Sequence, residues 1–194
     1  AMWDPKYSGE ILTFNNSRDA FGVAQYLLGY DVNSTNPDEW RAAEEKLKEQ
    51  KPLIQSYVMD EVFNKMEAGE AAMAPYYAGD YLTMKQENDD LAFVYPKEGT
   101  NKFVDVMCIP SSSENKKAAE LFINYMCEPE VALHNANYLG YLCPVTAVLS
   151  DDRYEYKDNE VLYPKQEVKT QFFHNLDQDT LDLLSKLWED LKLA

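Results

Sequence analysis

Short apolar segments alternate with stretches that carry helix-start signals, and this alternation is the feature that most constrains the fold. Strands are expected at Glu10–Phe14, Ala71–Pro75, Leu91–Tyr95 and Phe103–Ile109. Caps, early prolines or apolar periodicity predict a helix that follows the cap candidates at 15–17 and ends near 29–30, and helices at 40–50, 59–68 and 81–86. Further helices are expected to begin at 113–116 and at 128–130, and the tail at 177–191 has helical spacing. Residues 150–171 have no regular period. Strands and helices in alternation with short connections predict an α/β fold, with a mixed β-sheet flanked by helices.

The charge balance excludes several classes of protein. Of 194 residues, 18 are Lys or Arg and 34 are Asp or Glu, giving a formal net charge of −16. A nucleic-acid binder needs a basic surface, and anchoring to anionic lipid needs basic clusters. The three cysteines and two histidines lack metal-ligand spacing, and no cofactor fingerprint is present. The acidity permits a cationic ligand.

Several segments, in one order along the chain, resemble elements of a single known protein family. Tyr77–Asp80 resembles the WAGD turn of that family, and Tyr95–Gly99 resembles its YPKEG element. Phe103–Pro110 resembles WxDxLAIP, and 115–132 resembles NKxxAxxFINYLLxPEVA. Asn16–Phe21 resembles the helix start (D/S)xRE, and Gly140-Tyr141 matches a GY that follows the paired helices. The resemblance covers essentially the whole chain, and the family is that of the spermidine/putrescine-binding proteins of bacterial polyamine ABC importers.

The resemblance implies a periplasmic-binding-protein type II lobe that is part of a longer, two-lobed receptor. Residues 1–102 would form the first part of the second lobe, and 103–146 would be a return segment that normally completes the first lobe. Residues 147–194 would cross back and end in a helix packed on the second lobe. The implied function is capture of a polyamine for a membrane permease and its ATPase subunit. The implied location is the periplasm or the extracellular face of the bacterial membrane, where the protein could be lipid-anchored or fused to a permease.

A polyamine carries ammonium groups at intervals along an aliphatic rod. Each ammonium needs a carboxylate and hydrogen bonds, and the methylenes need flat apolar walls, which aromatic rings provide. The resemblance carries carboxylate roles onto Asp19, Asp80 and Asp105. It assigns aromatic roles to Tyr77, Phe103 and Tyr141. It also includes Asn16 and His174 among the ligand-binding residues. The pattern predicts that Asp105 and Phe103 share one face of a strand.

Purely structural roles compete with these assignments. Asp19 can pair with Arg18 or cap its helix, and Asp80 can be a helix N-cap. Of the three aspartates, Asp105 has the strongest case for a ligand role, because a carboxylate within an apolar strand is costly unless it is paired. Each aromatic residue taken alone is typical of a core or a surface. Asn16 stands where some spermidine binders have Asp, which favours the putrescine-type pattern.

Two other functions stay open. A protein of the same fold could carry thiamine or ferric iron, although carboxylates among aromatics suit an amine better. A carboxylate-based hydrolase is the third hypothesis, and no catalytic fingerprint supports it. The return segment is also expected to leave an unpaired edge, which predicts a homodimer or domain swap.

Overall fold

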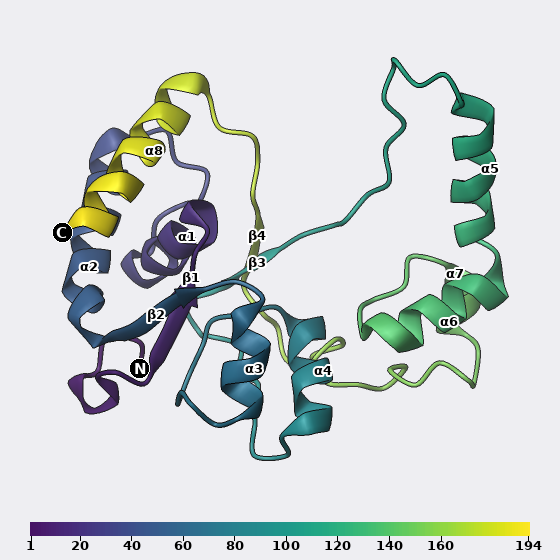
Figure 1. Cartoon of the computed structure of the whole chain (residues 1–194), viewed down its shortest axis with the longest axis horizontal. Coiled ribbons are helices and arrows are strands. Elements are labelled where there is room, and N and C mark those ends of the chain that lie inside the picture. The colour runs from purple at the N-terminus through teal and green to yellow at the C-terminus, as the bar shows by residue number, and fades with distance from the viewer. The chain divides into compact units, whose positions relative to one another are not determined.

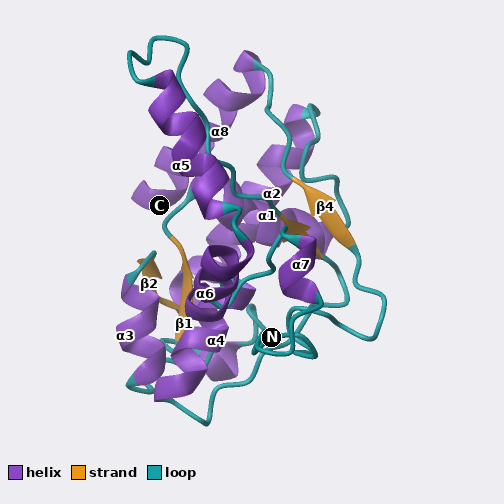
Figure 2. Ribbon diagram, turned by 90° about the vertical axis from the view of Figure 1, so that its right-hand side faces the viewer, coloured by secondary structure: helices purple, strands orange, loops and turns teal.

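The computed structural model describes residues 1–194, which divide into two compact units. Unit 1 comprises Ala1–Tyr77, Met84–Phe103 and Val168–Ala194, and unit 2 comprises Ala78–Thr83 and Val104–Glu167. Figure 2 shows short strands among longer helices. The predicted α/β class is confirmed, whereas the division at 102 and 146 stays a prediction.

The central strands of unit 1 form a parallel pair. Strand β1 (Ile11–Phe14) pairs with β2 (Ile54–Val58), and all four residues of β1 are buried. A strand with both faces covered is rich in apolar residues, and Thr13 is the one polar residue of β1. The expected strand at Ala71–Pro75 is reduced to one parallel bridge, between Ile11 and Met73.

Three helices build the main core of unit 1. These are α1 (Ser17–Leu28), α2 (Pro37–Gln50) and α8 (Gln178–Leu193), and Figure 1 shows α8 lying along α2. Helix α1 ends at Gly29, whose φ of 76° is the left-handed conformation that glycine adopts easily. The fully buried or nearly buried side chains between the three helices are Phe21, Ala24, Trp40, Ala43, Leu47, Leu184, Leu187 and Leu191.

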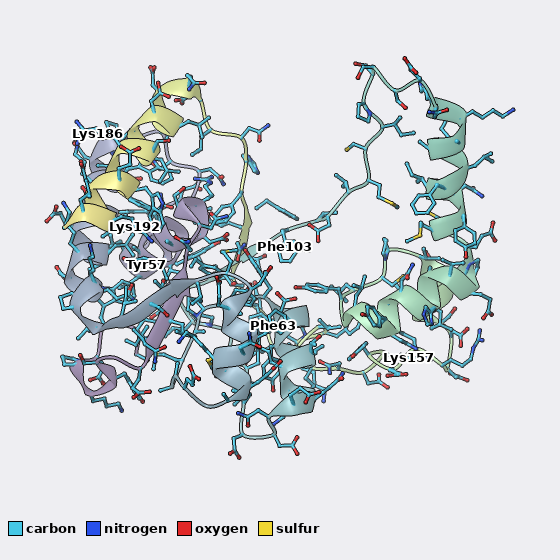
Figure 3. All side chains as sticks on the ribbon, viewed as in Figure 1. Tyr57, Phe63, Phe103, Lys157, Lys186 and Lys192 are labelled. Atoms are coloured by element: carbon cyan, nitrogen blue, oxygen red, sulfur yellow. The ribbon has the colours of Figure 1, made fainter.

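The C-terminal turn of α8 is fixed by two lysines. The Lys51 ammonium donates to the carbonyl oxygens of Leu191 and Lys192 at 2.7 and 2.9 Å, which satisfies carbonyls left open at a helix end. Lys192 lies 3.8 Å from the ring centroid of Tyr57 and 5.0 Å from that of Trp188. Figure 3 shows Lys192 beside Tyr57, so a cation–π contact joins α8 to β2.

Shorter elements complete unit 1. Helix α3 (Glu61–Glu67) follows β2, and 3-10 turns occupy Pro5–Tyr7 and Lys51–Leu53. Strand β3 (Thr100–Lys102) pairs in parallel with β4 (Thr170–Phe172), which the sequence pattern did not predict. The strand expected at Leu91–Tyr95 is absent, and that segment is irregular. Helix α4 (Ala78–Glu87) begins in unit 2 and ends in unit 1, and it starts three residues earlier than predicted.

Unit 2 has a small core of its own. Unit 2 contains helices α5 (Lys116–Met126), α6 (Pro129–Leu139) and α7 (Thr146–Leu149), together with the start of α4. Its buried cluster comprises residues from α6, α7 and the following loop: Ala132, Leu133, Ala136, Val148 and Tyr154. Arg153 binds both carboxylate oxygens of Glu130, which ties that loop to the first turn of α6. Helix α5 contributes no buried residue.

The predicted strand at Phe103–Ile109 is wrong. Strand β3 stops at Lys102, and the backbone of Val104–Ile109 makes no hydrogen bond with another segment. The sequence is rich in β-branched residues, but a strand exists only where a second strand pairs with it. Asp105 and Phe103 therefore do not share the face of a strand.

Candidate functional site

Asp19 and Tyr77 form a carboxylate–tyrosine pair in unit 1. Asp19 lies in the first turn of α1, where the helix dipole favours a negative charge. The Tyr77 hydroxyl donates to Asp19 Oδ2 at 3.1 Å. Burial raises the pKa of the Asp19 carboxyl, while the Tyr77 hydrogen bond and the Arg18 charge lower it. Burial therefore deprives the ionised carboxylate of part of its hydration, and a bound cation would compensate for that loss.

Aromatic rings surround the Asp19–Tyr77 pair. The Tyr77 ring centroid lies 4.9 Å from that of Tyr76, 5.5 Å from that of Phe103 and 5.6 Å from that of Phe14. The family resemblance assigned aromatic roles to Tyr77 and Phe103, and the structure brings these two rings together. Tyr76 and Phe14 were missed, although the adjacent tyrosines after Pro75 were a visible signal. The Phe103 side chain, labelled in Figure 3, is 43% exposed.

Arg18 ties the chain around His174 to α1. The Arg18 guanidinium donates to Asn33 Oδ1 at 2.9 Å and lies over the rings of Phe173 and Trp40. Asn33 Oδ1 also accepts the backbone N–H of His174 at 2.7 Å. The structure thus places the His174 backbone in this cluster and leaves the residue exposed. A ligand role for its imidazole stays a prediction.

Asn16 is the N-cap of α1. Its Oδ1 atom accepts the backbone N–H groups of Arg18 and Asp19 at 2.9 and 3.2 Å. This hydrogen bonding satisfies donors that every helix start leaves open, and it orients the backbone that carries Asp19. The structural role is therefore clear, and direct ligand contact by Asn16 stays a prediction.

Asp80 and Tyr141 form a second carboxylate–tyrosine pair, within unit 2. The Tyr141 hydroxyl donates to Asp80 Oδ1 at 2.9 Å, and the Tyr141 carbonyl accepts the hydroxyl of buried Tyr154 at 3.4 Å. Burial, followed by the hydrogen bond and charge of Asp80, raises the pKa of the Tyr141 hydroxyl. A tyrosine that keeps its proton remains a hydrogen-bond donor to the carboxylate.

Gly79 makes this second pair possible. A Cβ atom at position 79 would lie 2.3 to 2.5 Å from three ring atoms of Tyr141, so the ring rests on the glycine backbone. Asp105 also acts on Tyr141, since its charge contributes to the raised pKa of the hydroxyl. Asp105 itself is exposed, so the burial cost expected for a carboxylate in an apolar strand does not arise.

Replacing Gly79 with Ala is expected to destabilise the chain by about 1–3 kcal/mol, through overpacking against the Tyr141 ring. The sign is informative, because Gly to Ala inside a helix ordinarily stabilises by up to about 1 kcal/mol. Urea unfolding followed by circular dichroism measures the change. Thr83→Ala, at an exposed position of the same helix, is the control and should stay within about 0.5 kcal/mol. Stabilisation by Gly79→Ala would contradict the close packing of Tyr141.

Comparison with known proteins identifies the family. Residues 1–162 match the model of the bacterial extracellular solute-binding proteins. The chain belongs to this family. The spermidine/putrescine-binding periplasmic protein of Escherichia coli is 31% identical over 166 residues, which are 86% of this chain and 48% of that protein. The putrescine-binding periplasmic protein PotF of Escherichia coli is 27% identical over 168 residues, covering 83% of this chain and 45% of PotF.

A solved structure supports the same assignment. The substrate-binding protein PotD of a spermidine/putrescine ABC transporter from Streptococcus pneumoniae has a TM-score of 0.82 and 29% identity. The match covers 99% of this chain and 60% of that one. The resemblance found from the motifs is thus confirmed. The chain spans about half the length of the curated relatives it matches.

Proposed function

We propose that this chain is the ligand-binding part of a receptor that captures polyamines for uptake by an ABC transporter. The observation that carries the proposal is the pair of carboxylate–tyrosine contacts, Asp19 with Tyr77 and Asp80 with Tyr141. Relatives named as spermidine/putrescine-binding and putrescine-binding proteins support it. The function requires binding and release, with no covalent chemistry.

Each carboxylate–tyrosine pair suits one ammonium group. In the first pair, Tyr77 binds Oδ2 of Asp19, while Asp19 Oδ1 accepts no hydrogen bond from the chain. An ammonium at Oδ1 would form a charge-assisted hydrogen bond and restore the solvation that Asp19 lacks. The rings of Tyr77, Tyr76 and Phe103 offer apolar faces to the neighbouring methylenes and attract the cation.

In the second pair, Tyr141 orients Asp80, and Asp105 adds negative potential. Because each pair would take an ammonium group, we infer that the ligand class is aliphatic polyamines, the class that the names of the relatives give. Asp80 together with the uncharged Asn16 favours the diamine putrescine over spermidine. Asn16 and His174 would contribute polar contacts to an amine bound at Asp19, within unit 1.

The proposal extends to the transport system. The receptor would deliver its ligand to a membrane permease driven by an ATPase subunit, in the periplasm or at the outer face of the membrane. The relatives from Escherichia coli carry the word periplasmic in their names. Within this chain, no helix has the length and apolar character that crossing a bilayer requires.

Nuclear magnetic resonance on the isotopically labelled chain tests the proposal. Putrescine and spermidine, titrated to about 10 mM so that weak binding is detected, should give saturable shifts at Asp19, Tyr77, Asp80 and Tyr141. Butane-1,4-diol has the length of putrescine without its charges and should give none. Thiamine and ferric citrate test the two alternative cargoes. Saturable shifts with thiamine or with ferric citrate would overturn the proposal. So would the absence of shifts with putrescine and with spermidine.

Amine binding is expected to strengthen as pH rises through the raised pKa of Asp19, because a bound ammonium requires the ionised carboxylate. Burial sets that pKa above the usual 3.8, so ligand binding expels a proton in this window. Without ligand, the folded chain keeps this proton to a higher pH than the unfolded chain does. The contribution of Asp19 to stability therefore falls as pH rises from the unfolded to the folded pKa.

Putrescine titrations between about pH 4 and pH 7 measure this dependence. Asp19→Asn removes the titrating group, so the part of the pH dependence due to Asp19 should disappear. Asp190→Asn, an exposed position on α8, should keep the wild-type profile. An unchanged profile in the Asp19→Asn variant would contradict the assigned protonation step.

A further inference from the structure

Arg18 is next to Asp19 in the chain, yet the two side chains do not pair. The Arg18 Nη2 atom donates instead to Asn33 Oδ1 at 2.9 Å and to the His174 carbonyl at 3.4 Å. Asp19 accepts the Tyr77 hydroxyl at Oδ2 and receives no hydrogen bond from Arg18. The ion pair between neighbours that the sequence allowed is therefore absent, and the carboxylate of the proposed amine site is not neutralised by an internal cation.

Aromatic rings hold the Arg18 guanidinium in this position. Its Cζ atom lies 4.7 Å from the ring centroid of Phe173 and 5.5 Å from that of Trp40. Gly22 admits the Phe173 ring, because a Cβ atom at position 22 would lie 3.0 Å from the tip of that ring. Gly22 and Arg18 are four positions apart, so they lie on the same side of α1. The Arg18 cluster, all within unit 1, consists of Arg18, Asn33, Trp40, Phe173 and the His174 backbone.

The cluster leaves part of the guanidinium without a hydrogen-bond partner. The Nη1 atom of Arg18 is buried and donates to no group of the chain. Burial lowers the pKa of Arg18, but a guanidinium stays protonated in proteins, so the buried charge persists. A buried charged donor without an acceptor is costly, and it would gain a strong hydrogen bond by reaching a carboxylate.

Two carboxylates are candidate partners for an Arg18 side chain released from the cluster. The carboxylate charges that act on Arg18 are those of Asp19 first and Asp31 second. Asp31 Oδ1 already accepts the backbone N–H of Asn33 at 2.8 Å, whereas Asp19 Oδ1 accepts no hydrogen bond from the chain. Burial also deprives Asp19 of hydration, and a guanidinium would compensate for that loss as an ammonium would. Asp19 is therefore the favoured partner.

We propose that the Arg18 cluster withholds an internal cation from Asp19 and thereby reserves that carboxylate for the ligand. The inference rests on the proposed amine site, and it makes Asn33 and Phe173 positioning residues of that site, which act through Arg18. Outside the cluster, Arg18 would be a tethered competitor with an effective concentration on the order of millimolar. The apparent affinity for the ligand would fall in proportion to the fraction of molecules in which Asp19 stays free of Arg18.

A purely structural role of the cluster predicts a different response to mutation. Asn33 also joins the backbone of Phe172 and His174 to the loop after α1, so breaking the cluster would cost stability under either interpretation. Only the proposal predicts that a further change, removal of the Arg18 charge, repairs the effect at Asp19. If the role were structural, truncating Arg18 as well would add to the loss of packing.

The carboxyl carbon resonance of Asp19 tests the proposal without any amine. Asn33→Ala combined with Phe173→Ala, which we call the release variant, removes the acceptor and one ring of the cluster. The pKa of Asp19 should fall by about 1 or more in this variant, because a nearby opposite charge stabilises the carboxylate. Adding Arg18→Met should return this pKa to the wild-type value or raise it further. An unchanged pKa in the release variant, as when Arg18 moves to Asp31, would overturn the proposal.

Putrescine titrations of the same variants measure the consequence for the ligand. The release variant should bind about tenfold more weakly, the factor that corresponds to a pKa change of about 1. Adding Arg18→Met should restore the affinity to within about twofold of the wild type. An affinity that stays low after Arg18→Met overturns the proposal in favour of a structural role. If the wild-type chain binds no amine, the proposed function fails, and the carboxyl titration still decides whether the cluster withholds Arg18.

A matched control removes the same two types of side chain from exposed positions of unit 1. Asn64→Ala combined with Phe172→Ala should leave the pKa of Asp19 unchanged and the putrescine affinity within about twofold of the wild type. Equal effects in this control would overturn the proposal, since any loosening of unit 1 would then suffice. Circular dichroism checks folding. If the release variant does not fold, Phe173→Leu alone carries both measurements, with smaller changes expected in the same direction.

Discussion

Replacing Asp19 with Asn is expected to weaken putrescine binding by roughly 10- to 100-fold, because a charge-assisted hydrogen bond contributes about 1.5–3 kcal/mol. Asparagine keeps the size of the side chain and can still accept the Tyr77 hydroxyl, so the fold should persist. The lost quantity is the negative charge that the ammonium requires. Asp80→Asn should have an effect of the same order in the second carboxylate–tyrosine pair.

Calorimetry or chemical-shift titration with putrescine measures these affinities. Asp190→Asn removes the same charge from an exposed position on α8 and therefore controls for the change in net charge. It should alter the affinity by less than about twofold, because exposed charges are strongly screened. Equal losses in the Asp19 and Asp190 variants would mean that overall acidity, and not the assigned site, attracts the amine.

Removing the Trp40 side chain is expected to destabilise unit 1 by about 3–5 kcal/mol, through the loss of buried area and the cavity left behind. Trp40 is fully buried, its ring centroid lies 5.8 Å from that of Phe21, and its Nε1 donates to the Ser34 carbonyl at 2.8 Å. The Arg18 guanidinium also lies over the Trp40 ring, with Cζ 5.5 Å from the ring centroid. The Trp40→Ala variant should therefore loosen the Arg18 cluster together with the core.

Urea unfolding followed by the fluorescence of the remaining tryptophans measures this loss. Leu27→Ala, on the same unit but 40% exposed, is the matched control and should cost less than about 1 kcal/mol. The contrast follows mainly from burial, and the larger side chain of Trp40 and its hydrogen bond to Ser34 add to it. Similar costs for the two variants would contradict the placement of Trp40 in the core.

The elements that the sequence predicts well are those whose signals are local. Helix α1 has its cap at Asn16 and its left-handed glycine at Gly29, so both ends are readable without any partner. Strand β2 was missed because Ile54–Val58 contains polar Gln55 and Ser56, and its extended state depends on pairing with β1. The reverse error occurred at Phe103–Ile109. A strand was predicted there from strand-forming residues, but no second strand pairs with Val104–Ile109.

The site shows the same division between local and distant information. Tyr77 and Asp19 are 58 positions apart, and no spacing rule links them, so the motif resemblance supplied their common role. Tyr76 and Phe14 were overlooked because each reads as an ordinary core aromatic. The requirement for glycine at position 79 becomes visible only when the Tyr141 ring is seen resting on it.

The partition of the chain into two units also determines what optical probes can see. All three tryptophans, Trp3, Trp40 and Trp188, belong to unit 1, whereas unit 2 contains tyrosines and no tryptophan. Tryptophan emission therefore follows the melting of unit 1, and the loosening of unit 2 leaves it almost unchanged. Far-ultraviolet circular dichroism includes α5 and α6, so a transition present there and missing from the emission would isolate unit 2. Fluorescence alone would therefore not detect a separate unfolding transition of unit 2.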